Sequence, residues 1–141
     1  MKIDRFISYI ILAIIIIASI GVIFIVVNPA PGEKFTEFYI LGSDGKAGNY
    51  PTNLTVNESG TLIIGIVNHE GAPTNYQLAV KLNNNTITQQ NISLQNNEKK
   101  ETTFTFTPNQ TGNNQTLDFY LFKLPDTQNV YRFLELLINV S

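Results

Sequence analysis

The chain has 141 residues, no cysteine, one histidine and a formal net charge of −2. Thiol catalysis, disulfides and thiolate metal sites are therefore excluded. Nucleic acid is not an expected partner, because the nine Lys and Arg residues form no basic cluster.

The first predicted element is an uncharged apolar run over residues 7–27, which follows a short head at 1–6. A helix needs roughly 20 apolar residues to cross the hydrocarbon core, so the run predicts a transmembrane helix in a lipid bilayer. A cleaved signal peptide is the alternative, but its apolar run would have about 7–15 residues and end at small residues. This run ends instead in Val-Val-Asn-Pro at 26–29. Lys2 and Arg5 predict a cytoplasmic N-terminus and an extracellular remainder.

Residues 28–34 form a short proline-containing linker, and residues 35–141 form the predicted outer domain. Within this domain the hydrophobic period is two, as where Tyr76, Leu78 and Val80 alternate with polar or small residues. Such alternation is typical of strands with one buried face. The predicted strands are 35–41, 53–56, 62–67, 76–82, 91–94, 103–107, 117–124 and 133–140. Three of these runs, 62–67, 117–124 and 133–140, are continuously apolar and are expected to be central or to pack against a second layer.

Turn-forming residues separate these strands at regular intervals. The turns are predicted at 43–45, 57–60, 71–73, 83–85, 95–97, 108–114 and 125–126. Short strands punctuated every ~8–12 residues, without an amphipathic helical pattern, predict an all-β fold. The fold class expected is an immunoglobulin-like antiparallel β-sandwich of seven or eight strands, without the Cys and Trp core of antibody domains.

The outer domain is dense in Asn-x-Ser/Thr sequons, none with proline in the middle. They begin at Asn53, Asn57, Asn84, Asn91, Asn109, Asn114 and Asn139. We predict N-linked glycans at the first six, whereas Asn139 is the weakest candidate because it lies so near the C-terminus. The alternative is that an Asn- and Thr-rich domain produces matches by chance, since positions i and i+2 of a strand share one wet face.

The only histidine, His69, lies in Asn-His-Glu at 68–70. It could be a metal ligand or a general base, or a histidine or asparagine of this segment could close a turn by hydrogen bonding to the backbone at 71–73. We favour the turn, because a catalytic base needs a nucleophile or an acid in reach. No Gly-x-Ser-x-Gly, His-Glu-x-x-His or phosphate-binding glycine loop is present. The sequence therefore predicts no catalytic residues, no cofactor and no enzyme.

Metal binding is also not predicted. A blue-copper site needs a cysteine, two histidines and usually a methionine, whereas this chain has no cysteine, one histidine and only Met1. A calcium site would need several carboxylates to meet at one end of the sandwich. The acidic residues that could do so are Asp44, Glu58, Glu70, Asp118 and Asp126. No two of them have the spacing of a dedicated loop, and acidic residues at turns usually serve turn geometry.

Several segments resemble one known family. They are Pro31–Gly42, Tyr50-Pro51, the Gly-Ile-Val-Asn-His-Glu run at 65–70, and Tyr76. Together they are similar to the outer domain of an archaeal membrane family known as domain of unknown function 1616. The resemblance implies an archaeal cell-surface protein whose outer domain is similar to adhesion-type sandwiches. Many members have several N-terminal spans where this chain has one, and the family supplies no functional residues to carry over.

Two functions of different kind agree with these patterns. In the first, the chain is a non-enzymatic, single-pass surface protein whose glycosylated sandwich contacts other proteins of the cell envelope. In the second, it is an accessory subunit of a larger membrane complex and caps the outer face of that complex. The aromatic residues of the domain could form a ligand platform, but at strand spacing they are expected to be core.

Overall fold

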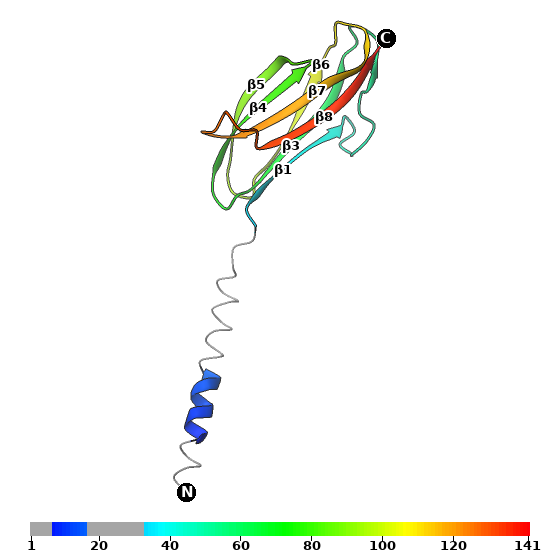
Figure 1. The fold of residues 1–141 in the computed structure, drawn as a ribbon. Helices are drawn as coiled ribbons and strands as arrows, with labels where there is room; N and C mark the ends of the chain where they lie inside the picture. The colour runs from blue at the N-terminus through cyan, green and yellow to red at the C-terminus, as the bar shows by residue number, and fades with distance from the viewer. Residues whose placement is uncertain (1–6, 17–32) are drawn as a thin grey trace. The chain divides into compact units, whose positions relative to one another are not determined.

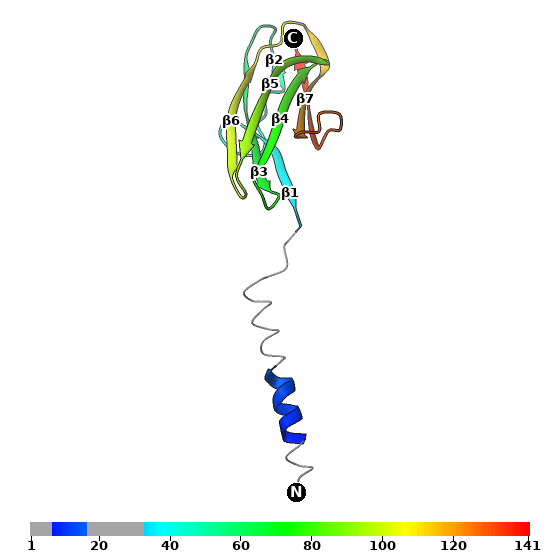
Figure 2. The ribbon, with the colours of Figure 1, turned by 90° about the vertical axis from the view of Figure 1, so that its left-hand side faces the viewer.

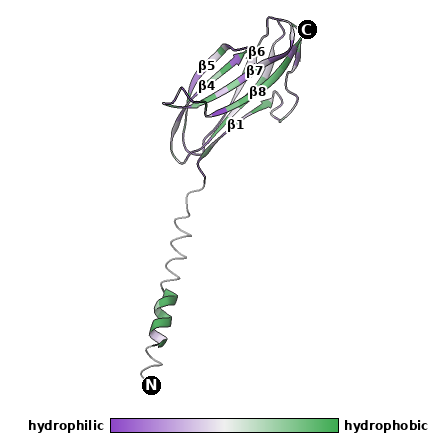
Figure 3. Cartoon of the chain, viewed as in Figure 1, coloured by the Kyte–Doolittle hydropathy of each residue, from purple (hydrophilic) through white to green (hydrophobic). Residues whose placement is uncertain are grey.

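The computed structural model describes residues 7–16 and 33–141. Residues 7–16 form an apolar helix (Figures 1 and 3), and Lys34–Ser141 is a separate compact unit. The rest of the predicted membrane run, residues 17–27, lies outside the described residues, as do the head at 1–6 and linker residues 28–32. In the two described ranges, no helix has both the length and the apolar character needed to cross a membrane.

Within residues 33–141, eight strands form two facing sheets, which confirms the predicted β-sandwich (Figures 1 and 2). The strands are β1 (Phe35–Gly42), β2 (Asn53–Leu54), β3 (Gly60–His69), β4 (Thr74–Leu82), β5 (Asn85–Leu94), β6 (Lys99–Phe106), β7 (Gly112–Lys123) and β8 (Arg132–Val140). One sheet has the order β1-β3-β6, and the other has the order β2-β8-β7-β4-β5. The first sheet is antiparallel throughout.

The core lies between the sheets and follows the predicted period of two. In β3, Leu62, Ile64 and Ile66 point inward and are buried, and Leu117 and Phe119 do the same from β7. β3 and β7 are each paired on both sides. The apolar runs at 62–67 and 117–124, which lie almost entirely in these two strands, are therefore central, as expected. These interdigitated side chains join the two sheets through apolar burial.

Two details of the predicted sheets are wrong. The sandwich is not purely antiparallel, because Asn53 and Leu54 pair in parallel with the end of β8. The strand predicted at 53–56 has only these two residues, since Asn57 adopts a positive φ of 66° and turns the chain. The run at 133–140 lies between β7 and the two-residue β2 in its sheet, and its inward side chains Leu134, Leu136 and Ile138 pack in the core against the second layer, as expected. Its continuous apolar character also leaves Phe133 48% exposed on the outer face.

β5 is longer than predicted, since it pairs with β4 from Asn85 to Leu94 rather than beginning near residue 91. A bulge opposite Val80 and Lys81 inserts Ile87 into the strand. β5 is an edge strand, and most of its side chains are exposed and polar. An edge strand of this kind has little apolar alternation by which a sequence pattern could mark its start.

Gly65 in β3 makes room for an aromatic ring on the outer face of the three-stranded sheet. A Cβ at this position would overlap the ring of Tyr39, the residue opposite it in β1. The Tyr39 hydroxyl then reaches across β3 and donates a hydrogen bond to Glu101 Oε1 at 2.8 Å. Burial and this hydrogen bond raise the pKa of Tyr39 to about 12. The glycine thus lets one side chain connect all three strands of the sheet.

Candidate functional site

Six of the seven sequons lie at one end of the sandwich, which we call the distal end. It contains the C-terminus and is opposite the end at which β1 begins (Figure 1). Backbone hydrogen bonds join the segments there: Asn57 to Pro108, Asn83 to Thr116, and Val56 to Ser141. The sequon asparagines in these segments are Asn53, Asn57, Asn84, Asn109, Asn114 and Asn139, and all are exposed. Asn91 is also exposed but lies within β5.

Three sequon asparagines also have a conformational role. Asn57, Asn84 and Asn114 have positive φ angles of 66°, 66° and 57°, a region in which asparagine is enriched among non-glycine residues. The other predicted sites have no such requirement. The Asn139 carboxamide oxygen accepts a hydrogen bond from the backbone N–H of Asn114, so that side chain is already engaged. Sugar attachment at the six predicted positions stays a prediction.

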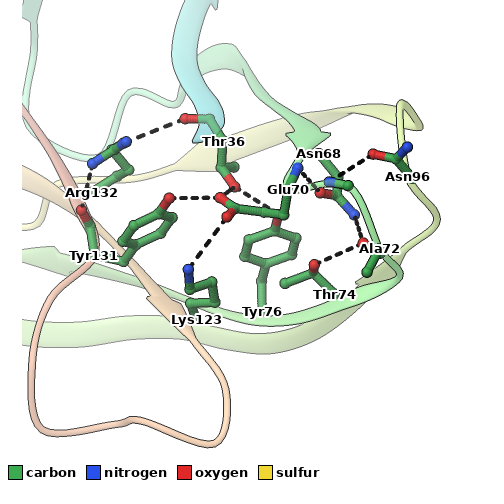
Figure 4. Close-up of polar contacts among 11 residues, drawn as sticks. Thr36, Asn68, Glu70, Ala72, Thr74, Tyr76, Asn96, Lys123, Tyr131 and Arg132 are labelled. Atoms are coloured by element: carbon green, nitrogen blue, oxygen red, sulfur yellow. Dashed lines mark hydrogen bonds and ion pairs between the residues drawn. The ribbon is translucent and has the colours of Figure 1, made fainter. Parts of the chain in front are cut away.

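The most connected polar cluster surrounds Glu70, at the end where β1 begins (Figure 4). Its carboxylate accepts hydrogen bonds from the Tyr131 hydroxyl at 2.6 Å and the Thr36 hydroxyl at 2.7 Å, and Lys123 Nζ lies at 3.3 Å. The Thr36 hydroxyl also shares a 2.7 Å hydrogen bond with the hydroxyl of fully buried Tyr76. Glu70 thereby joins β1, β4, β7 and the loop before β8.

Hydrogen bonds around Glu70 favour its ionised carboxylate, and its partner Tyr131 makes cation–π contacts. Lys123 and Arg132 each lie 4.4 Å from the centre of the Tyr131 ring. Burial alone would raise the pKa of Glu70, but the hydrogen bonds from Tyr131, Thr36 and Lys123 outweigh it and hold the pKa below its ordinary value. An ionised carboxylate surrounded by donors is a poor proton acceptor. The arrangement therefore fits a structural role, in which Glu70 connects strands of the two sheets, rather than acid–base chemistry.

His69 does not itself close the turn at 71–73, but the expectation that a histidine or an asparagine of this segment closes it is confirmed. The neighbouring Asn68 does so, with its Nδ2 donating to the Ala72 carbonyl at 2.9 Å. Because residues alternate along β3, His69 lies on the outer face. Its Nε2 is 2.8 Å from Glu37 Oε2, and its ring centre is 4.7 Å from that of Phe35, with the two rings tilted by 31°. His69 and Glu70 thus have separate hydrogen-bond partners.

The acidic residues considered for calcium are dispersed. Asp44, Glu58 and Asp126 accept hydrogen bonds from nearby backbone N–H groups, which is the turn role expected for them. Within residues 7–16 and 33–141, no three His, Asp or Glu side chains come together as a metal site. Asp118 differs from the others because it lies within β7 and is only 5% exposed.

Asp118 is at the centre of a surface that sequence patterns did not single out, the outer face of β4, β7 and β8. Across the strands it is opposite Lys81 on one side and Glu135 on the other. Burial and the neighbouring Glu135 raise the pKa of Asp118 to about 6, although Lys81 opposes the shift. Asp118 Oδ1 has no hydrogen-bond partner among the described residues. The alternation in β7 shows that Asp118 points outward, but its burial could not be foreseen.

We expect Asp118→Asn to abolish a specific pH dependence of stability. A carboxyl whose pKa is raised on folding contributes stability below its ordinary pKa of about 4, and loses it as the pH rises through about 6. Asparagine cannot ionise, so at pH 7 the variant should be more stable, by on the order of 1 kcal/mol. Urea unfolding of the full chain at a fixed protein concentration between pH 4 and 7.5 measures this.

Asp126→Asn is the matched control, since hydrogen bonds from Asn129 and Gln128 lower the pKa of Asp126. Its contribution is present above the ordinary carboxyl pKa and is lost as the pH falls, which is the opposite sign. An Asp118→Asn variant with the same pH profile as the unmodified chain would show that Asp118 ionises normally.

Comparison with known proteins agrees with this architecture. Residues 29–139 match the domain of unknown function DUF1616. The chain belongs to this family. The DUF1616 match covers nearly all of the sandwich and confirms the family resemblance found in the sequence. No curated protein matches the chain.

Solved structures similar to this DUF1616 chain share its fold. The crystal structure of the CARDB domain of the PF1109 protein from Pyrococcus furiosus, in complex with di-metal ions, has a TM-score of 0.55 and 19% identity. That match covers 76% of this chain and 93% of the CARDB domain. The solution NMR structure of the same domain has a TM-score of 0.51 and 19% identity, covering 77% and 97%. At this identity the likeness establishes a CARDB-like β-sandwich and nothing about ligands.

Proposed function

We propose that the chain is a non-enzymatic, single-pass cell-surface protein whose extracellular glycosylated sandwich acts through contacts with envelope proteins. The anchor is the uncharged run at 7–27, and Lys2 and Arg5 place the N-terminus in the cytoplasm. Membership of an uncharacterised family and a CARDB-like fold are compatible with an interaction module.

The observation that carries the proposal is the position of the sequons. All seven asparagines are exposed, and six of them lie at the distal end, away from the end at which the chain enters β1. A glycan needs an exposed acceptor in an extracellular domain. Glycans at the distal end would leave the flat outer faces of both sheets mostly uncovered and available to protein partners.

Glycopeptide mass spectrometry of the full chain from its native membrane tests this proposal. We expect sugar at several of Asn53, Asn57, Asn84, Asn91, Asn109 and Asn114. Because Asn84 has a positive φ, its sequon is best removed by Thr86→Ala, which leaves the turn residue in place and should delete one glycan without loss of stability. Ser93→Ala removes the sequon of Asn91 and also an exposed hydrogen bond to Asn75. Complete absence of sugar at all six positions would contradict the proposal.

The second function, an accessory subunit of a membrane complex, is supported by exposed apolar side chains on the outer face of β8, Phe133 and Leu137. Extraction in mild detergent distinguishes the two. A defined complex with other membrane proteins would favour the accessory subunit. A preparation that contains only this chain would favour the free-standing surface protein.

A further inference from the structure

The outer face of β4, β7 and β8 has a regular arrangement of residues on both sides of β7. In one row, Ala79, Tyr120 and Phe133 lie side by side across the three strands. In the next row, Lys81, Asp118 and Glu135 do the same. In each row the residues on the two sides of β7 are therefore unlike. Small Ala79 and the large ring of Phe133 flank β7 in the first row, and the cation Lys81 and the anion Glu135 flank it in the second. We call these two rows the β7 face.

The groups of the β7 face are incompletely satisfied within the chain. Phe133 is 48% exposed even though its ring contacts Tyr120 at 5.1 Å. Lys81 Nζ lies over the Tyr120 ring, 5.1 Å from its centre, and forms no ion pair with a described carboxylate. Asp118 is buried with one oxygen that has no partner. Exposed aromatic surface beside unpaired charge is typical of an interface rather than of a solvated sheet.

We infer that the β7 face binds a second copy of itself, with a two-fold axis that lies between the copies and runs along β7. Adjacent strands are about 4.8 Å apart and packed sheets about 10 Å apart. This rotation exchanges the two sides of β7, so Glu135 of each copy faces Lys81 of the other. In the same way Phe133 of each copy packs over the small side chain of Ala79. A two-fold contact must be self-complementary. The outer residues of both rows meet that condition, while Tyr120 and Asp118, in the central strand, face their own counterparts across the axis.

The same axis suits chains that share one membrane. Rotation about an axis parallel to the strands keeps the strand direction, so both copies begin β1 at the same end of the dimer. Two chains anchored in one bilayer require this arrangement, and in this respect the inference depends on the proposed function. Of the sequon asparagines in this sheet, Asn91 lies in β5, outside the three strands of the β7 face, whereas Asn114 and Asn139 lie in β7 and β8 at the distal end.

Charge reversal tests the pairing. The molar mass of the full chain in detergent is measured by sedimentation over a range of concentrations, first for the unmodified protein and then for Lys81→Glu and Glu135→Lys. We expect a dimer for the unmodified protein and self-association weakened by about a hundredfold for each reversal, because each places like charges opposite one another twice. Equal amounts of the two variants should form a mixed dimer, since both contacts are then complementary again.

Mutual rescue distinguishes this interface from other routes to a dimer. Pairing through the N-terminal helix or through another face would leave the single reversals dimeric, and this result would overturn the inference, as would a monomeric unmodified protein.

Lys81→Glu adds a carboxylate beside buried Asp118 and could impair folding. In that case Phe133→Ser, at a half-exposed position, should weaken the dimer at least tenfold, and an unchanged dimer would count equally against the inference. Glu37→Lys, on the opposite sheet, is the control. Glycan and protease measurements are independent of these outcomes.

Discussion

Glu70→Ala is expected to lower the free energy of unfolding of the sandwich by about 3 kcal/mol. The substitution removes the shared acceptor of Thr36, Lys123 and Tyr131. Two hydroxyls and one ammonium group then lose their shared acceptor in a part-buried site, although Thr36 keeps its hydrogen bond with Tyr76, and β1 loses its polar connection to β7. Urea unfolding of the full chain in detergent, followed by tyrosine fluorescence, measures the difference.

The pH dependence gives a second readout of the same cluster. Because the pKa of Glu70 is lowered on folding, its contribution is present above the ordinary carboxyl pKa and is lost as the pH falls through the lower folded value. The variant should therefore lose this part of the acid sensitivity. Glu37→Ala, which removes a half-exposed carboxylate on the outer face, is the matched control and should change stability by less than about 1 kcal/mol. Equal losses of unfolding free energy in the two variants would show that the Glu70 cluster does not stabilise the connection between the sheets.

Asn68→Ala is expected to destabilise the sandwich by a similar amount, about 3 kcal/mol. Asn68 is fully buried. Its Nδ2 donates to the carbonyls of Ala72 and Leu94, and its Oδ1 accepts from the backbone N–H of Glu70. Alanine removes the amide from all three backbone groups, of which the Ala72 carbonyl keeps its hydrogen bond from Thr74, and it also leaves a small cavity.

The next residue in the chain is the natural control for Asn68. His69→Ala removes a larger side chain, but His69 lies on the outer face with an exposed carboxylate as its partner. Its loss should cost less than about 1 kcal/mol. Thermal or urea unfolding of the two alanine variants side by side measures the contrast. If His69→Ala were the more damaging of the two, the assignment of Asn68 as the residue that closes the turn would be wrong.

Three residues of the Gly-Ile-Val-Asn-His-Glu run have structural roles. Gly65 accommodates the Tyr39 ring, Asn68 closes the turn, and Glu70 connects the sheets. The segment is distinctive because three neighbouring residues each meet a separate folding requirement. Residues that contact a partner would lie elsewhere, and the β7 face is where the structure brings unsatisfied groups together.

Sequence patterns predicted most of the sandwich because a period of two records which side of a strand is buried. The alternation in β4 and the central positions of β3 and β7 were confirmed for this reason. The same signal fails for the first half of β5, whose exposed edge carries little apolar alternation. It also cannot find the Glu70 cluster, since Thr36 and Tyr131 are 34 and 61 positions from Glu70.

The most direct test of the central claim is protease treatment of intact cells that express the full chain with different tags at its two ends. We predict that the C-terminal tag and the sandwich are removed from the cells, while a short N-terminal fragment containing residues 7–27 stays in the membrane fraction. A sandwich that protease reaches only after the cells are broken, or a mature chain that begins after residue 27, would contradict the account.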